Sequence, residues 1–273
     1  MRSARMAAIP GLKKQWLEKF FRFGLISKGF VYCLLGLLTS LAAVGMSVEK
    51  ASKKDAFNFI YQQPFGKLLL ALIALGFFGY VTLRLFQTFK DINHEGNSAK
   101  GMVARIGYAI SALVYFSLGL YATKLVLSVT EKGSNTQKFI VAKVLELDGG
   151  SWIIGIVALI IIISGGYQIY KGASFRFLKK IQLTGSRFSD VFRKAGLIGY
   201  ISRGIVLLII GYFLLHAALY KNAGKVQDTD GAFGFLESRF GSLIMAVVAL
   251  GLVAYGMFMF VKAKYEQMYF KIN

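Results

Sequence analysis

Six long apolar segments constrain the fold more than any other feature of the sequence. An α-helix needs about 20 mostly apolar residues to cross the hydrocarbon core of a bilayer, and each segment reaches that length. Because a soluble fold of this size could not bury so many apolar side chains, the pattern predicts an all-α integral membrane protein with six transmembrane helices. The segments cover roughly residues 23–46, 65–89, 103–129, 151–172, 196–220 and 240–264.

The charges between these segments predict how the chain is oriented. Lys and Arg number 33 against 13 Asp and Glu, which gives a net charge of +20. Of the basic residues, 20 fall in the two tails and the loops 84–105 and 171–194, and only 11 in the other three loops. By the positive-inside rule both termini are expected to be cytoplasmic. This accounts for the excess of positive charge without nucleic acid, which would need a basic stripe on a soluble domain.

Location and lipid partners follow from the same features. The first apolar segment is too long for the apolar region of a signal peptide, so we expect it to remain as a spanning helix. Cys33 is the only cysteine, so no intrachain disulfide can form. We expect a multi-pass protein of a bacterial inner membrane, with anionic lipids on its cytoplasmic face. A protein partner or a second copy of the chain is a further expected partner.

The first apolar segment recurs twice along the chain. RFGLISKGFVYCLLG (22–36) aligns without a gap with RIGYAISALVYFSLG (105–119), and IGYISRGIVLLIIG (198–211) follows at an offset of 175. The same offset extends into the next helix, where Tyr80 matches Tyr255. Because each of the three tandem units has an even number of spans, all three units have the same orientation in the membrane. The repetition therefore predicts pseudo-threefold symmetry about the membrane normal.

The middle copy of the second helix is less clear. Gly79 and Tyr80 match Gly166 and Tyr167, and Arg84 then matches Lys171. The resulting organisation is an amphipathic cytoplasmic segment at 1–22, repeat 1 at 23–89, repeat 2 at 90–172, a basic loop at 173–195, repeat 3 at 196–264 and a tail at 265–273. The segment at 12–23 suits an interfacial helix and, equally, a basic flank that orients the first span.

Small residues recur seven positions apart on the first helix of every repeat. This spacing places each pair on one helix face, and helices in lipid associate closely at small residues. We expect the first helices of the three repeats to pack against one another through these faces. The residues are Gly29, Gly36, Ala112, Gly119, Gly204 and Gly211.

The repeat resembles a bacterial membrane family known as domain of unknown function 1206. The resemblance rests on R-x-G-x-x-x-x-G-x-V-Y-x-x-x-G, followed by a second helix that contains Gly-Tyr, and it covers nearly all of the chain after residue 20. Ala112 replaces a glycine in the second copy, and Leu207 replaces the tyrosine in the third. The resemblance implies a membrane location and six helices in three repeats. It implies no activity.

Ionisable residues inside the apolar segments are the functional candidates, because they are costly to bury in a membrane. Lys28 and Arg203 occupy equivalent places in repeats 1 and 3, and Arg84 lies near the end of the second segment. Two interpretations remain open. The three cations bind an anionic ligand, or their long side chains snorkel to the interface, which the depth favours. His216 is more typical of a structural residue than of a proton carrier.

The sequence offers no catalytic constellation. No Asp or Glu falls in an apolar segment, and no Walker, nucleophile-elbow or zinc-protease motif is present. We therefore expect neither an enzyme nor a cofactor or metal site. Two functions stay open: binding or transport of a small anion or anionic lipid, and a non-enzymatic membrane scaffold or accessory subunit of a larger complex.

Overall fold

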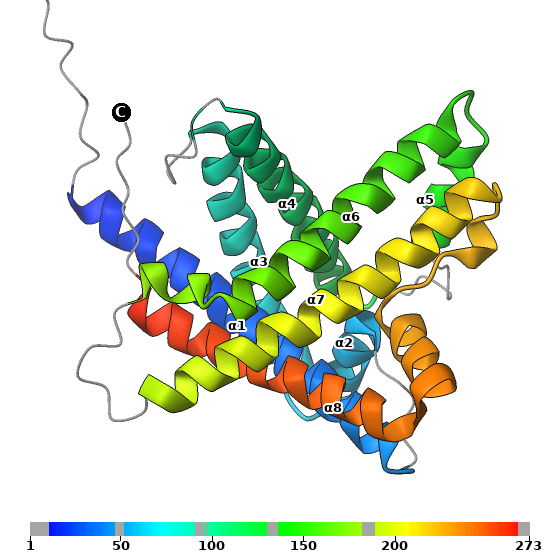
Figure 1. Cartoon of the computed structure of the whole chain (residues 1–273). Helices are drawn as coiled ribbons and strands as arrows, with labels where there is room; N and C mark the ends of the chain where they lie inside the picture. Colours follow the sequence, from blue (N-terminus) through cyan, green and yellow to red (C-terminus); the bar gives the residue numbers. More distant parts are fainter. Residues whose placement is uncertain are drawn as a thin grey trace, which may run out of the picture.

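Helices make up nearly all of the described structure. The computed structural model describes residues 11–46, 52–90, 96, 98–129, 136–181 and 189–266 (Figure 1). Six of its helices are long and apolar enough to span a membrane, namely α1, α3, α4, α6, α7 and α8, which confirms the predicted six candidate spans. The elements are α1 (Gly11–Ala43), α2 (Lys53–Gln62), α3 (Gly66–Phe89), α4 (Ala99–Val126), α5 (Thr136–Leu145), α6 (Gly150–Ala173), η1 (Arg176–Lys180), α7 (Ser189–Leu219), η2 (Ala223–Lys225) and α8 (Thr229–Tyr265).

Each repeat also contains a short helix that the sequence analysis treated as a loop. Helix α2 precedes the span α3, and α5 precedes α6. Helix α8 breaks at Gly241 (φ 83°), so its first part corresponds to these short helices. Phe65 (φ 61°) and Gly149 (φ 79°) precede the other two second spans, and both take the left-handed helical conformation. The chain therefore turns sharply into the second span of each repeat.

The spans pack in a cyclic order. The second span of each repeat packs on the first span of the next, as α3 on α4, α6 on α7 and α8 back on α1. Within repeats 1 and 3 the two spans also pack on each other, as α1 on α3 and α7 on α8. Helices α4 and α6 of repeat 2 make no comparable contact and diverge (Figure 1). The spans thus form a ring that is open between α4 and α6.

The glycine-bearing faces mediate the contacts between repeats, but with partners other than those expected. A Cβ on Gly36 would lie 2.5 Å from the carbonyl oxygen of Ala249 in α8, and one on Gly204 would lie 2.6 Å from Ile169 in α6. The expectation that the first helices pack on one another was wrong. Each meets a second span, because the second spans present small residues of their own that let the backbones approach. Gly29 and Gly36 face α8, Gly119 faces α3, Gly204 and Gly211 face α6, and Ala112 of α4 is buried.

These contacts also fix the register of the second spans. Gly29 lies opposite Gly256, and its counterpart Gly204 lies opposite Gly165. Gly165 is therefore the counterpart of Gly256, which makes Ser164 the counterpart of Tyr80 and Tyr255, and Gln168 that of Arg84. The sequence match of Tyr80 with Tyr167 was wrong by three residues. Tyr167 points outward and is 55% exposed.

Two equivalent arginines fasten first spans to the ends of second spans. Arg22 of α1 donates hydrogen bonds to the carbonyl oxygens of Ala263 and Lys264 at the end of α8. Arg105 of α4 donates to the carbonyl oxygen of Thr88 at the end of α3, at 2.7 Å. A cation suits these unpaired carbonyl groups at a helix C-terminus. Helix α1 runs unbroken from Gly11, so residues 12–23 belong to the same helix as the first candidate span, Glu18–Ala43.

Candidate functional site

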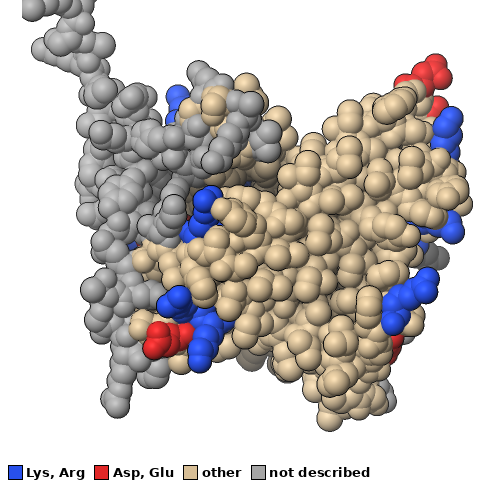
Figure 2. Space-filling model, viewed as in Figure 1, with Lys and Arg blue, Asp and Glu red and all other residues tan. Residues whose placement is uncertain are grey.

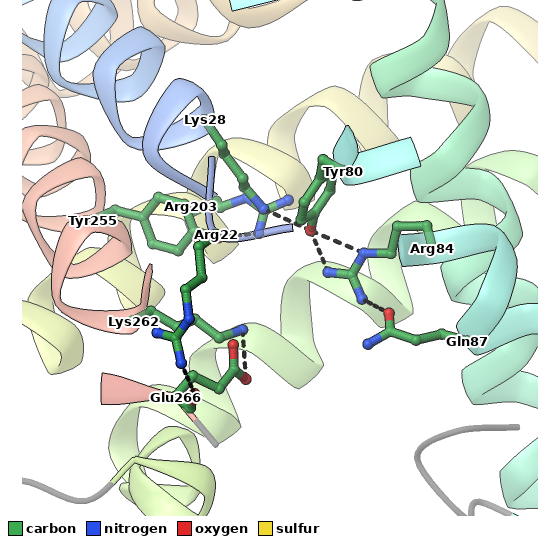
Figure 3. A network of polar contacts seen from close by, with 9 residues as sticks. All are labelled: Arg22, Lys28, Tyr80, Arg84, Gln87, Arg203, Tyr255, Lys262 and Glu266. Atoms are coloured by element: carbon green, nitrogen blue, oxygen red, sulfur yellow. Dashed lines mark hydrogen bonds and ion pairs between the residues drawn. The ribbon is translucent and has the colours of Figure 1, made fainter. Parts of the chain in front are cut away.

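A buried group of cations and tyrosines lies where the six spans converge. We call it the cation–tyrosine cluster and define it by Lys28 and Tyr32 of α1, Tyr80 and Arg84 of α3, Tyr115 of α4, Arg203 of α7 and Tyr255 of α8. Figure 3 draws Lys28, Tyr80, Arg84, Arg203 and Tyr255. Gln168 of α6 reaches the cluster through a hydrogen bond from Arg203, at 3.0 Å. Every span therefore contributes at least one side chain.

Two glycines place the tyrosines beside the cations. A Cβ on Gly24 would lie 2.7 Å from the backbone nitrogen of Tyr80, and one on Gly199 would lie 2.5 Å from the Cα of Tyr255. Lys28 and Arg203 follow these glycines by four residues, which is about one helical turn. The close approach of the two helices in repeats 1 and 3 thus sets each tyrosine against the cation of its own repeat.

Tyr80 joins the first two cations. Its hydroxyl oxygen accepts hydrogen bonds from Lys28 Nζ at 3.1 Å and from Arg84 Nε at 2.9 Å. Lys28 is 2% exposed, and Arg84 is held further by a hydrogen bond to Gln87 at 2.7 Å. One neutral phenol oxygen therefore lies between two positive charges inside the protein.

Arg203 makes the equivalent contact in repeat 3. Its Nη1 donates to the hydroxyl oxygen of Tyr255 at 2.7 Å, which repeats the Lys28–Tyr80 bond with the same separation along the chain. Its guanidinium also lies over the rings of Tyr255 and Tyr32, at 5.0 and 5.5 Å from their centres. Repeats 1 and 3 thus each place a basic side chain in contact with the equivalent tyrosine.

The tyrosine rings form a cage around Lys28. Its Nζ lies 4.8, 5.0 and 5.6 Å from the ring centres of Tyr80, Tyr115 and Tyr255. The rings also pack edge to face, with centres 4.7 Å apart for Tyr80 and Tyr115 and 5.0 Å apart for Tyr32 and Tyr255. Ring faces attract cations, so the cage partly offsets the loss of water around the ammonium.

The cluster has no counter-charge among the residues that the structure describes. None of Lys28, Arg84 and Arg203 has a carboxylate within ion-pair distance there, and their hydrogen bonds go to Tyr80, Gln87, Tyr255 and Gln168. Near the helix ends Lys262 pairs with Glu266 at 3.3 Å (Figure 3). The interior of the described bundle therefore holds three basic side chains whose described hydrogen-bond partners include no carboxylate.

Among the residues that the structure describes, two polar atoms at the cluster lack any hydrogen-bond partner. They are the hydroxyl oxygen of Tyr115 and the Nε of Arg203. Tyr115 is 3% exposed, and its ring lies against those of Tyr80 and Phe77. Buried polar atoms are nearly always paired, so two orphans beside unpaired cations mark a place suited to a polar, negatively charged ligand.

The structure brings the predicted ligand-binding residues Lys28, Arg203 and Arg84 together and shows that Lys28 does not snorkel. Its amine is buried against Tyr80 instead of reaching an interface. Sequence reasoning missed the tyrosines, although Tyr80 and Tyr255 had been matched as repeat equivalents. The sequence signal that could have identified them is a tyrosine at the same position of two apolar segments. His216 lies apart from the cluster, with its ring 4.3 Å from that of Tyr220.

Comparison with known proteins agrees with the repeats. The pattern of the Domain of Unknown Function (DUF1206) matches residues 23–91, 106–174 and 198–266, which begin at the offsets seen in the sequence. A protein of Bacillus subtilis (strain 168) that bears the name Uncharacterized protein YxxB is 32% identical over 266 residues, 96% of each chain. No solved structure matches the chain. With three matches across its length, the protein belongs to the DUF1206 family.

Proposed function

We propose that the protein binds an anionic ligand, a small anion or an anionic lipid headgroup, at the cation–tyrosine cluster. The observation that carries the proposal is the convergence of Lys28, Arg84 and Arg203 without a described carboxylate partner. Binding of this kind serves storage, sensing or transport, and it needs no catalytic group.

The energetics of burial support a ligand of negative charge. A cation placed in the centre of a membrane helix costs about 2.5–3.5 kcal/mol on insertion scales, and the three cations also repel one another. A cation–π contact returns about 2 kcal/mol or more when it is desolvated. Tyr80 and Tyr255 supply such contacts and hydrogen bonds but no negative charge. A bound anion would supply the missing charge and would accept hydrogen bonds from the Tyr115 hydroxyl and from Arg203 Nε.

The arrangement of the spans supports a central position for this ligand. The cyclic order, in which each second span meets the next first span, is the order that pseudo-threefold symmetry about the membrane normal would produce. A site to which all six spans contribute would lie close to that axis. The three repeats differ at the site, with Lys28, Ser111 and Arg203 in equivalent places, so the ligand would be held asymmetrically.

We further propose that the protein lies in a bacterial inner membrane with both termini in the cytoplasm. The excess of Lys and Arg in the tails and in the loops 84–105 and 171–194 supports this orientation. Arg84 lies five residues before the end of α3 at Phe89, which would place the cluster toward the cytoplasmic half of the bilayer.

Native mass spectrometry of protein extracted gently from its own membrane tests the proposal. The wild-type protein is expected to retain an anionic adduct that the double variant Lys28→Gln, Arg203→Gln loses. Lys171→Gln is the matched control, because Lys171 also lies over a tyrosine ring (5.1 Å from that of Tyr200) but outside the cluster. An adduct that all three proteins keep equally would contradict the proposal. A stable complex with another protein and no adduct would favour the scaffold function.

Transport can be separated from binding in proteoliposomes. If the protein moves the anion, flux is expected to fall at least tenfold in the same double variant. Unchanged flux would contradict a transport role for these two cations.

A further inference from the structure

The open place in the helix ring coincides with the most exposed spans. In the most apolar stretch of α4 22% of the residues are buried, and in that of α6 17%, against 50–56% in α1, α3 and α8. The surface dips between the α3–α4 pair and α6 (Figure 2). Repeat 2 therefore presents a lateral gap where repeats 1 and 3 have a packed helix pair.

The sequence explains why repeat 2 stays open. In repeat 1 the side chain of Ser27 packs directly on Gly76, and in repeat 3 Ser202 packs in the same way on Gly251. The counterparts in repeat 2, in the register fixed by the glycine contacts, are two isoleucines, Ile110 of α4 and Ile160 of α6. Two β-branched side chains cannot reproduce the close approach of a serine to a glycine.

The gap reaches the level of the cation–tyrosine cluster. Gly24 and Gly199 lie against the backbone at Tyr80 and Tyr255, whereas their counterpart Gly107 has no atom within 4 Å of an added Cβ. Repeat 2 is therefore open at the height at which the other repeats close beside the cations. The two helices that border the gap also reach the cluster, α4 through Tyr115 and α6 through Gln168.

We propose that an anionic phospholipid enters the cluster sideways from the bilayer, through the gap between α4 and α6. Its phosphate would bind Lys28 and Arg203 and would accept hydrogen bonds from the Tyr115 hydroxyl and from Arg203 Nε. Its acyl chains would lie along α4 and α6. This inference rests on the proposed anion site and names its ligand class. A lateral gap between apolar helices, at the level of three cations that have no described carboxylate partner, complements a molecule with a negative head and apolar tails. A water-soluble anion needs no such entrance.

The test closes the gap without changing a cation. The double variant Ile110→Ser, Ile160→Gly gives repeat 2 the pair that packs in repeats 1 and 3. The matched control, Ile106→Ser with Ile156→Gly, alters two lipid-exposed isoleucines one turn away on the same helices, which are 45% and 56% exposed. Each purified protein is equilibrated with nanodiscs that contain phosphatidylglycerol and phosphatidylcholine, and retained lipid is counted by native mass spectrometry.

The wild type and the control are expected to retain phosphatidylglycerol over phosphatidylcholine, and the closed variant to retain about tenfold less. Equal retention in the closed variant, together with loss in Lys28→Gln, Arg203→Gln, would overturn lateral entry but leave the anion site standing. If inorganic phosphate protects the wild type from thermal unfolding and phosphatidylglycerol does not, the ligand is a soluble anion and the inference is wrong. If neither probe responds to the two cations, the proposed function itself fails.

A second measurement keeps the inference testable if the closed variant does not fold. Phosphatidylglycerol with a diazirine in one acyl chain is photolysed with the wild-type protein, and the labelled peptides are mapped. Labels are expected to concentrate near Gly107 of α4, whose added Cβ atom meets open space, and near Ile160 of α6. The labels should decrease several-fold in Lys28→Gln, Arg203→Gln. Labels spread evenly over all exposed spans, with no response to that variant, would overturn the inference.

Discussion

Replacing Lys28 with methionine should make the ligand-free protein more stable, although Lys28 is one of its most buried polar residues. Lys28 Nζ and Arg84 Nε donate to the same oxygen of Tyr80, at 3.1 and 2.9 Å. The two nitrogens therefore lie at most about 6 Å apart, and two unit charges at that distance repel by about 3 kcal/mol at an effective dielectric constant of about 20. Removing the charge also ends the cost of its burial, which is several kcal/mol per ion.

The losses are smaller than these gains. Lys28→Met gives up one charged hydrogen bond, worth about 1.5–3 kcal/mol, and cation–π contacts worth about 2 kcal/mol. Methionine fills a similar volume, so little cavity cost arises. The net expectation is stabilisation by about 1–3 kcal/mol. At about 2–4 °C per kcal/mol this is a rise in Tm of about 2–12 °C.

Thermal unfolding of the delipidated protein in detergent measures this shift. Repeating the melt with saturating anionic ligand should reverse the order, because ligand at 1,000 times its Kd stabilises the wild type by about 4.1 kcal/mol and binds Lys28→Met only weakly. Lys28→Arg, which keeps the charge, is the control and should respond to ligand. A lower Tm for ligand-free Lys28→Met would refute the reasoning, since it would show that the cation is a structural residue with a satisfied environment.

Three further predictions concern packing, the orphan hydroxyl and topology. Gly36→Ala should destabilise the protein by about 1–3 kcal/mol in thermal melts, because the added Cβ would lie 2.5 Å from a carbonyl oxygen of α8. Gly107→Ala, where the added Cβ meets open space, should be neutral or slightly stabilising. Equal effects of the two substitutions would argue against close packing of α1 on α8 at Gly36. Tyr115→Phe should leave the ligand-free Tm unchanged but weaken anion binding about five- to tenfold in a titration, and unchanged affinity would show that the hydroxyl meets no ligand. In a Cys33→Ser background, single cysteines introduced in either tail should resist an impermeant thiol reagent added outside intact cells; rapid labelling would contradict the cytoplasmic termini.

Much of the architecture could be predicted from the sequence because its determinants are local or periodic. A spanning helix is specified by its own run of apolar residues, and the three repeats by a fixed offset between like residues. The choice of helix partners was not predictable in this way. Gly36 and Gly204 predict a close helix–helix contact, but the second spans also carry small residues. The spacing of these residues does not indicate which pairs of helices pack against each other.

For a related reason, the sequence predicted the cations of the candidate site but not its tyrosines. Lys28, Arg84 and Arg203 stand out because charges are rare in apolar segments, and their type suggested an anion. Tyr115 did not stand out, since tyrosine is common in membrane proteins and its role depends on a ring cage assembled from four helices. The gap in repeat 2 was hidden as well. Isoleucines such as Ile110 and Ile160 are common in spanning helices and attract no notice in the sequence. Their effect on packing becomes apparent only from the contact of Ser27 with Gly76 at the equivalent positions of repeat 1.

The central claim is that the cation–tyrosine cluster holds an anion, and a structure with ligand present tests it most directly. The protein would be placed in nanodiscs rich in phosphatidylglycerol, bound to a rigid antibody fragment and imaged by electron cryomicroscopy. We expect headgroup density within hydrogen-bond reach of Lys28 Nζ, Arg203 Nε and the Tyr115 hydroxyl, with tail density between α4 and α6. A cluster closed by a carboxylate of the chain itself, or filled by apolar side chains, would contradict the account.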